Sequence, residues 1–208
     1  IMAMILRPFI PGIMLSLPLY AAAASPWVVT DGSTLQVTSD YSSVEQNDVP
    51  LVVSGAGSQL TTNSGLTFTT SHAGTRGARV TEQGSLNLNG VTLSTSEENS
   101  TAIYADSGTL TITDSTIATL GSQSRGIRAK NSDVTIINST LTTNTIDGAI
   151  EVSGGVLKAD GLTITSPVAG IEVYAHEGVY GNATLNNIHF TLTGDKAIQA
   201  IFARRGHV

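Results

Sequence analysis

Apolar residues recur along this chain in triplets whose members stand at relative positions 0, +2 and +7. A nearly constant spacing of roughly 20 to 50 residues between such patterns is typical of a repeat architecture. The chain is therefore expected to fold as a series of similar coils. Steps of 24, 24, 23 and 26 residues separate the first members of successive triplets, which are Leu86, Leu110, Val134, Leu157 and Ala183.

An alternating pair of apolar residues precedes each triplet, in most cases close behind a glycine. Alternation with a period of two indicates a short strand that buries one face. Each coil thus holds three short strands, and the Gly, Asn, Asp and Ser residues between them leave room only for tight corners. The pairs are Ala78 with Val80, Ile103 with Ala105, Ile127 with Ala129, Ile150 with Val152, Ile171 with Val173, and Ile198 with Ala200.

These strands predict an all-β fold, a single-stranded parallel β-helix with coils of about 24 residues. Each strand would pair with its counterpart one coil further on, so that three parallel sheets surround a narrow apolar core. Near-identical segments such as "LTITDSTI" and "VTIINSTL" recur because each lies on the last in the same environment. A sandwich of antiparallel hairpins also has short, regularly spaced strands, but it has no reason to keep its apolar triplets in register over successive coils.

Three regions follow from this pattern. Residues 1–24 resemble a secretory signal peptide, with a lone Arg7, an apolar run over 9–19 and small residues at 22–24. The run is too short for a membrane-spanning helix, and prolines interrupt it. Residues 25–76 fit the period loosely and are expected to form an N-terminal cap and irregular first coils. Residues 77–208 are expected to be regular coils that end without a cap, in a chain truncated at its C-terminus.

The composition of the chain is polar without being highly charged. Charged residues make up 12% and hydrophobic residues 40%, so the chain should fold despite its many Ser, Thr and Asn residues. The net charge of −6 disfavours nucleic acid and anionic lipid as partners, since both require a basic face. The chain has no cysteine, which excludes a small disulfide-bonded scaffold.

Coils that read "GTLTITDSTIAT", "SDVTIINSTLTT" and "GVLKADGLTITS" behind a signal peptide resemble the pertactin-like passenger domains of Gram-negative autotransporters. The resemblance covers roughly residues 50 to 201. It implies a right-handed β-helix that a C-terminal membrane barrel carries across the outer membrane, for display on the cell surface or release. It also implies a non-enzymatic role as an adhesin or virulence scaffold, with a host-cell surface protein or glycan as partner. The barrel itself would lie beyond Val208 or be lost.

The alternative is a secreted polysaccharide-active enzyme of the same fold, a lyase or a glycoside hydrolase. Its acids would be Asp114 and Asp160, which stand two coils apart in similar corners. Two coils correspond to about 9.6 Å, close to the separation of carboxylates in inverting glycosidases. The two aspartates are one residue out of register, however, and corner Asp residues more often stabilise turns.

We expect neither a metal nor a cofactor. The chain has four histidines, at positions 72, 176, 189 and 207, and none has metal-ligand spacing with a neighbour. Strand alternation predicts that His189, between Ile188 and Phe190, points away from the core. The sequence also lacks a glycine-rich phosphate loop and a nucleophile elbow.

One insertion interrupts the period. The segment "YAHEGVYGN" follows Val173, where the preceding coil has a much shorter corner. Insertions in repeat proteins form surface loops, and such loops often carry recognition. Tyr174 and Tyr180 could stack on a sugar or a receptor surface, and His176 and Glu177 could supply polar contacts. The insertion is therefore our candidate binding site, with a tolerated loop that binds nothing as the alternative.

Overall fold

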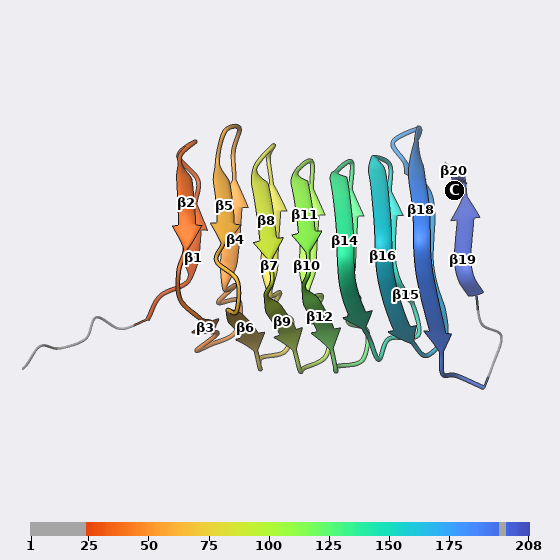
Figure 1. Ribbon diagram of the computed structural model, residues 1–208, viewed down its shortest axis with the longest axis horizontal. Coiled ribbons are helices and arrows are strands. Elements are labelled where there is room, and N and C mark those ends of the chain that lie inside the picture. The colour runs from red at the N-terminus through yellow and green to blue at the C-terminus, as the bar shows by residue number, and fades with distance from the viewer. Residues whose placement is uncertain (1–23, 196–198) are drawn as a thin grey trace, which may run out of the picture.

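The computed structural model describes residues 24–195 and 199–208, and every regular element within these ranges is a β-strand. The strands wind into a parallel β-solenoid of about seven turns, whose coils lie side by side in chain order along the long axis (Figure 1). The predicted all-β parallel β-helix is therefore confirmed. Within the described ranges, no helix is long and apolar enough to cross a membrane.

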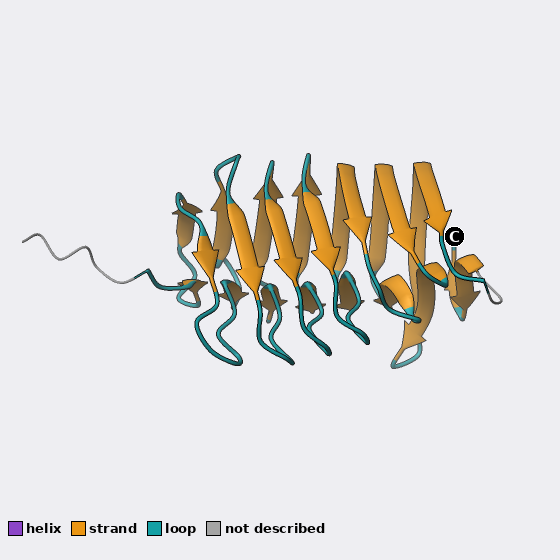
Figure 2. Cartoon of the chain, turned by 90° about the horizontal axis from the view of Figure 1, so that it is seen from below, coloured by secondary structure: helices purple, strands orange, loops and turns teal. Residues whose placement is uncertain are grey.

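Each coil has three faces, which we call A, B and C in the order in which the chain passes through them. The strands form the faces, and the loops are confined to the corners between them (Figure 2). Face A consists of β1 (Trp27–Val29), β4 (Leu51–Ser54), β7 (Ala78–Thr81), β10 (Ile103–Asp106), β13 (Ile127–Lys130), β15 (Gly148–Ser153), β17 (Ala169–His176) and β19 (Gln199–Arg204).

Faces B and C share three long strands in the C-terminal half, which run through the corner between the two faces without a break: β14 (Asp133–Thr142), β16 (Val156–Ser166) and β18 (Val179–Leu192). Face B also contains β2 (Thr34–Val37), β5 (Gln59–Thr62), β8 (Ser85–Asn89), β11 (Thr109–Thr113) and β20 (Gly206–His207). Face C also contains β3 (Tyr41–Ser42), β6 (Thr67–Thr70), β9 (Thr92–Thr95) and β12 (Thr116–Thr119).

The apolar triplets lie in register and fill the interior. Ile112 pairs with Ile136, which pairs in turn with Ala159, and all three are at least 96% buried. The triplet leaders stack in the same way, as Leu110 does on Val134. Burying a Leu or Ile side chain contributes about 1.5–3 kcal/mol, and each such residue packs against its counterparts above and below. This repetition is what makes a narrow core stable in a chain without disulfides.

Serine and threonine hydroxyl groups connect successive coils at the corners. At the corner between faces C and A, the Ser100 backbone N–H donates to Ser124 Oγ at 2.9 Å, and the Thr75 N–H donates to Ser100 Oγ at 3.2 Å. All three residues are fully buried. Among the described residues, no buried side-chain nitrogen or oxygen lacks a hydrogen-bond partner. The abundant uncharged polar residues are therefore partly structural.

The final alternating pair differs from the prediction. Ile171 pairs with Ile201 and Val173 pairs with Ala203, three residues beyond the predicted counterparts Ile198 and Ala200. Ile198 itself lies outside the described residues. The segment "IQAIFA" offers two apolar alternations three residues apart, so the period alone could not choose between them. The backbone hydrogen bonds to β17 determine the choice.

The N-terminal region joins the same stack. Strands β1 to β6, within residues 25–76, pair in parallel with the strands that follow them, and Leu35 lies beside Leu60. The predicted signal peptide, residues 1–24, lies outside the described residues except for Ala24.

Candidate functional site

The insertion after Val173 forms a β-hairpin. Strand β17 runs on to His176 and then pairs antiparallel with the start of β18, with Ala175 opposite Tyr180 and His176 opposite Val179. The two turn residues have positive φ angles, 48° at Glu177 and 80° at the following glycine. This is the geometry of a type I′ turn, whose twist matches that of the flanking strands. The insertion is thus an ordered projection.

The register shows what the hairpin replaces. Ser153 pairs with Tyr174 and Val156 pairs with Asn182, so residues 175–181 take the place of the short corner at 154–155 in the preceding coil. The additional residues project from the corner between faces A and B. The corner at 154–155 consists of two glycines, so no core side chain is displaced and the stack accommodates the hairpin without a change of register.

The four predicted binding residues do not form one surface. Strand alternation places Tyr174 and His176 on one face of the hairpin and Tyr180 on the other. The rings of Tyr174 and Phe202 are 5.8 Å apart, whereas the ring of Tyr180 lies 5.4 Å from that of His207. Each tyrosine therefore packs against a different part of the next coil, and they do not form a shared aromatic platform.

Tyr174 is held in place by its hydroxyl group. It donates to Glu172 Oε2 at 3.0 Å. Burial, together with this hydrogen bond, raises the pKa of Tyr174 to about 12. The phenol is therefore neutral at physiological pH and serves as a fixed aromatic surface. On the same face of the hairpin, His176 Nε2 lies 3.8 Å from Glu177 Oε1, and Glu177 is exposed.

A hollow of about 340 Å³ lies beside the hairpin. Tyr174, Ala175, Glu177 and Gly178 line one side, and Arg204 and Arg205 line the other. Sequence reasoning missed the two arginines because they are some 30 residues further along the chain. The register joins them to the site, since Arg204 pairs with Tyr174. His176 and Tyr180 do not line this hollow.

A second polar cluster lies on the outer side of face A. Glu151 and Glu172 are register partners on neighbouring coils, and their charges would repel each other if nothing lay between them. Arg125 donates to Glu172 Oε2 at 3.1 Å, lies 2.9 Å from Glu151 Oε2 and also donates to the Gly148 carbonyl oxygen at 2.9 Å. These contacts are internal and the side chains are largely buried, so the cluster holds three coils together.

The alternative catalytic acids stand in neighbouring columns of the stack. Asp160 pairs with Ile137, which pairs with Thr113, so Asp114 lies one column further along. Asp114 has a positive φ of 50°, and Asp160 Oδ1 accepts a hydrogen bond from Asn187 at 3.0 Å. Both aspartates therefore contribute to the corner between faces B and C, and the register does not place them in line.

His189 is exposed, as strand alternation predicted. Within the described ranges, no three His, Asp or Glu side chains are arranged to hold a metal ion.

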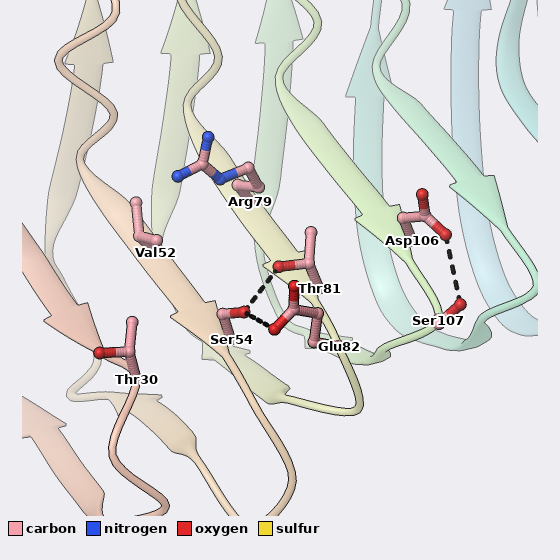
Figure 3. A pocket seen from close by; sticks show the side chains of 8 residues that line it. All are labelled: Thr30, Val52, Ser54, Arg79, Thr81, Glu82, Asp106 and Ser107. Atoms are coloured by element: carbon pink, nitrogen blue, oxygen red, sulfur yellow. Dashed lines mark hydrogen bonds between the residues drawn. The ribbon is translucent and has the colours of Figure 1, made fainter.

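A groove of about 550 Å³ crosses the outer side of face A over β1, β4, β7 and β10 (Figure 3). Hydrogen bonds within the chain occupy its carboxylates: Ser54 Oγ lies 3.3 Å from Glu82 Oε2, and Ser107 Oγ lies 3.3 Å from an oxygen of Asp106. Arg79 stands at the edge of the groove, and no described carboxylate lies within 4.0 Å of its guanidinium. Sequence reasoning did not identify this groove, because its residues come from four different coils.

Comparisons of the chain with protein-family models, with curated proteins and with solved structures found no match. A function must therefore be inferred from the geometry of the solenoid and from the residues that it exposes.

Proposed function

We propose that this protein is an exported binding module, an autotransporter passenger fragment that acts as a non-enzymatic adhesin or surface scaffold. The observation that carries the proposal is the hairpin at residues 174–181. It projects from an otherwise regular stack and presents exposed apolar side chains, with Val179 56% and Tyr180 48% exposed.

A two-residue turn between paired strands holds its side chains in fixed positions, and a rigid scaffold that presents a short projection is a common arrangement for recognition. Exposed aromatic residues and arginines are the side chains that most often dominate binding energy. Tyr180 on one face of the hairpin, and Arg204 and Arg205 in the hollow on the other, meet this description.

Residues 1–24 would direct export through the inner membrane, and a membrane barrel would carry the solenoid to the surface of a Gram-negative cell or release it. The partner would be a host-cell surface protein or a glycan. The solenoid architecture and the coil pattern support this proposal through their resemblance to passenger domains.

Binding of the purified protein to a panel of animal cells tests the proposal. We expect the double variant Val179→Ala/Tyr180→Ala to bind roughly tenfold more weakly, because losing an aromatic anchor commonly costs 1–2 kcal/mol or more. Replacement of residues 175–181 by Gly-Gly, the corner of the preceding coil, should weaken binding at least as much.

The matched control is Leu120→Ala/Ile146→Ala, which removes two apolar side chains that are 62% and 74% exposed at another corner. It should bind like the original chain. Equal binding by all variants would remove the hairpin from the proposal, and failure of the unaltered chain to bind any cell in the panel would remove the adhesin role.

A further inference from the structure

Three arginines surround one tyrosine on the outer side of face A. We call Arg76, Arg79, Tyr104 and Arg128 the arginine–tyrosine patch. Tyr104 lies in register between Arg79 on one neighbouring coil and Arg128 on the other. The guanidinium carbon of Arg76 lies 4.0 Å above the centre of the Tyr104 ring. A cation in this position is attracted by the electrons of the ring, so the tyrosine holds Arg76 in place.

The positive charge of the patch is only partly neutralised. Arg128 Nε lies 3.3 Å from Glu151 Oε1, but within the described ranges no carboxylate lies within 4.0 Å of Arg76 or Arg79. Burial, with a smaller contribution from the neighbouring arginines, lowers the pKa of Arg76. Such crowding of like charges costs stability and stands out in a chain of net charge −6.

The patch adjoins the groove of Figure 3. Arg79 lines both, and the groove continues from it across the neighbouring coils, with the hydroxyl groups of Ser54 and Thr81 on its floor. Register partners on successive coils repeat about every 4.8 Å along the stack. Together, the patch and the groove form a polar track along the long axis. Arg76 and Arg79, which pair with no described carboxylate, lie where the patch meets the groove.

We propose that this track binds a linear acidic polysaccharide laid along the axis of the stack. The guanidinium groups of Arg76, Arg79 and Arg128 would contact its carboxylate or sulfate groups, since a planar guanidinium donates two parallel hydrogen bonds to such anions. The hydroxyl groups that line the groove would meet the hydroxyl groups of the sugars. Charge complementarity selects this ligand class, and the site is separate from the hairpin.

The test is binding of the full chain to immobilised heparin, which is sulfated, to polygalacturonate, which is carboxylated, and to neutral dextran. We expect binding to one or both acidic polymers at low salt, weakening as salt is added, and none to dextran. Arg79→Gln should weaken binding at least tenfold, because it removes the charge-assisted hydrogen bonds of this guanidinium to the polymer. Arg79 is exposed, so folding should be unaffected.

Lys158→Gln is the matched control, since it removes one exposed positive charge from face B. It should bind like the unaltered chain, as should the variant in which Gly-Gly replaces residues 175–181. The proposal is overturned if Arg79→Gln and Lys158→Gln behave alike, if dextran binds as well as the acidic polymers, or if single-stranded DNA competes as effectively as they do. Binding to the acidic polymers does not depend on whether the hairpin variants still bind cells, so either proposal can fail while the other stands.

Discussion

At the scale of single residues, the backbone at the corner between faces B and C adopts a left-handed conformation in coil after coil. A left-handed φ suits glycine, and Asn and Asp tolerate it better than other residues do. The sequence places such residues at these corners from the second coil on, and where a glycine follows an Asn or Asp, the glycine takes the left-handed position. From the second coil on, the residues are Gly65, Gly90, Asp114, Asn138, Gly161 and Asn187, with φ between 46° and 79°.

Two glycines with similar φ angles separate conformational strain from crowding. Gly155 has a φ of 70°, and a Cβ there would lie 2.6 Å from the backbone nitrogen of Ser132 and against its carbonyl oxygen. At Gly178, where φ is 80°, an added Cβ would meet no atom within 4 Å apart from those of the adjacent residues. We expect Gly178→Ala to cost about 1 kcal/mol of unfolding free energy from strain alone, and Gly155→Ala about 3 kcal/mol or more. Urea unfolding measures both changes in free energy. If the two substitutions cost the same, the corner at Gly155 is not stacked closely on Ser132.

At the scale of elements, the outer side of face A is held together by ion pairs between strands. Arg125 precedes β13, Glu151 lies on β15 and Glu172 lies on β17, so one guanidinium joins three successive coils. The carboxylates are 11% and 13% exposed. Removing the guanidinium that bridges two largely buried like charges costs more than an exposed ion pair would contribute.

We therefore expect Arg125→Met to lower the free energy of unfolding by about 3 kcal/mol. Arg128→Met is the comparison, since Arg128 is 51% exposed and pairs with Glu151 at 3.3 Å; it should cost less than about 1 kcal/mol. Adding Glu172→Gln to Arg125→Met should recover part of the loss, because it removes the repulsion. If the double variant is no more stable than Arg125→Met, carboxylate repulsion is not the cause.

At the scale of the whole molecule, each coil contacts mainly the coils immediately before and after it. The stability of such a stack is approximately a sum of coil terms and interfaces between neighbours. Central strands such as β10 have partners on both sides, whereas β1, β2 and β3 pair on one side only within the described residues. Opening should therefore begin at an end of the stack.

Hydrogen exchange measures this directly. We expect the backbone amides of β10 to β12 to exchange more slowly than those of β1 to β3, because opening a central coil breaks two interfaces and opening a terminal coil breaks one. Ile136→Ala should lower the exchange protection of the backbone amides in the central coils toward that at the ends, because it leaves a cavity between two buried neighbours. Uniform exchange along the chain would instead indicate a single cooperative unit.

The sequence by itself determined the repeat, the three faces of each coil and the inward positions, because a stack places equivalent residues in equivalent environments and so repeats them visibly. It also located the hairpin, as a break in the period. The tertiary structure decided which distant residues meet: Arg204 beside Tyr174, Arg125 between two glutamates, and Ile201 rather than Ile198 beneath Ile171. The physical reason is that hydrogen-bonded register brings together residues from different coils, and no local pattern along the chain specifies which of them meet.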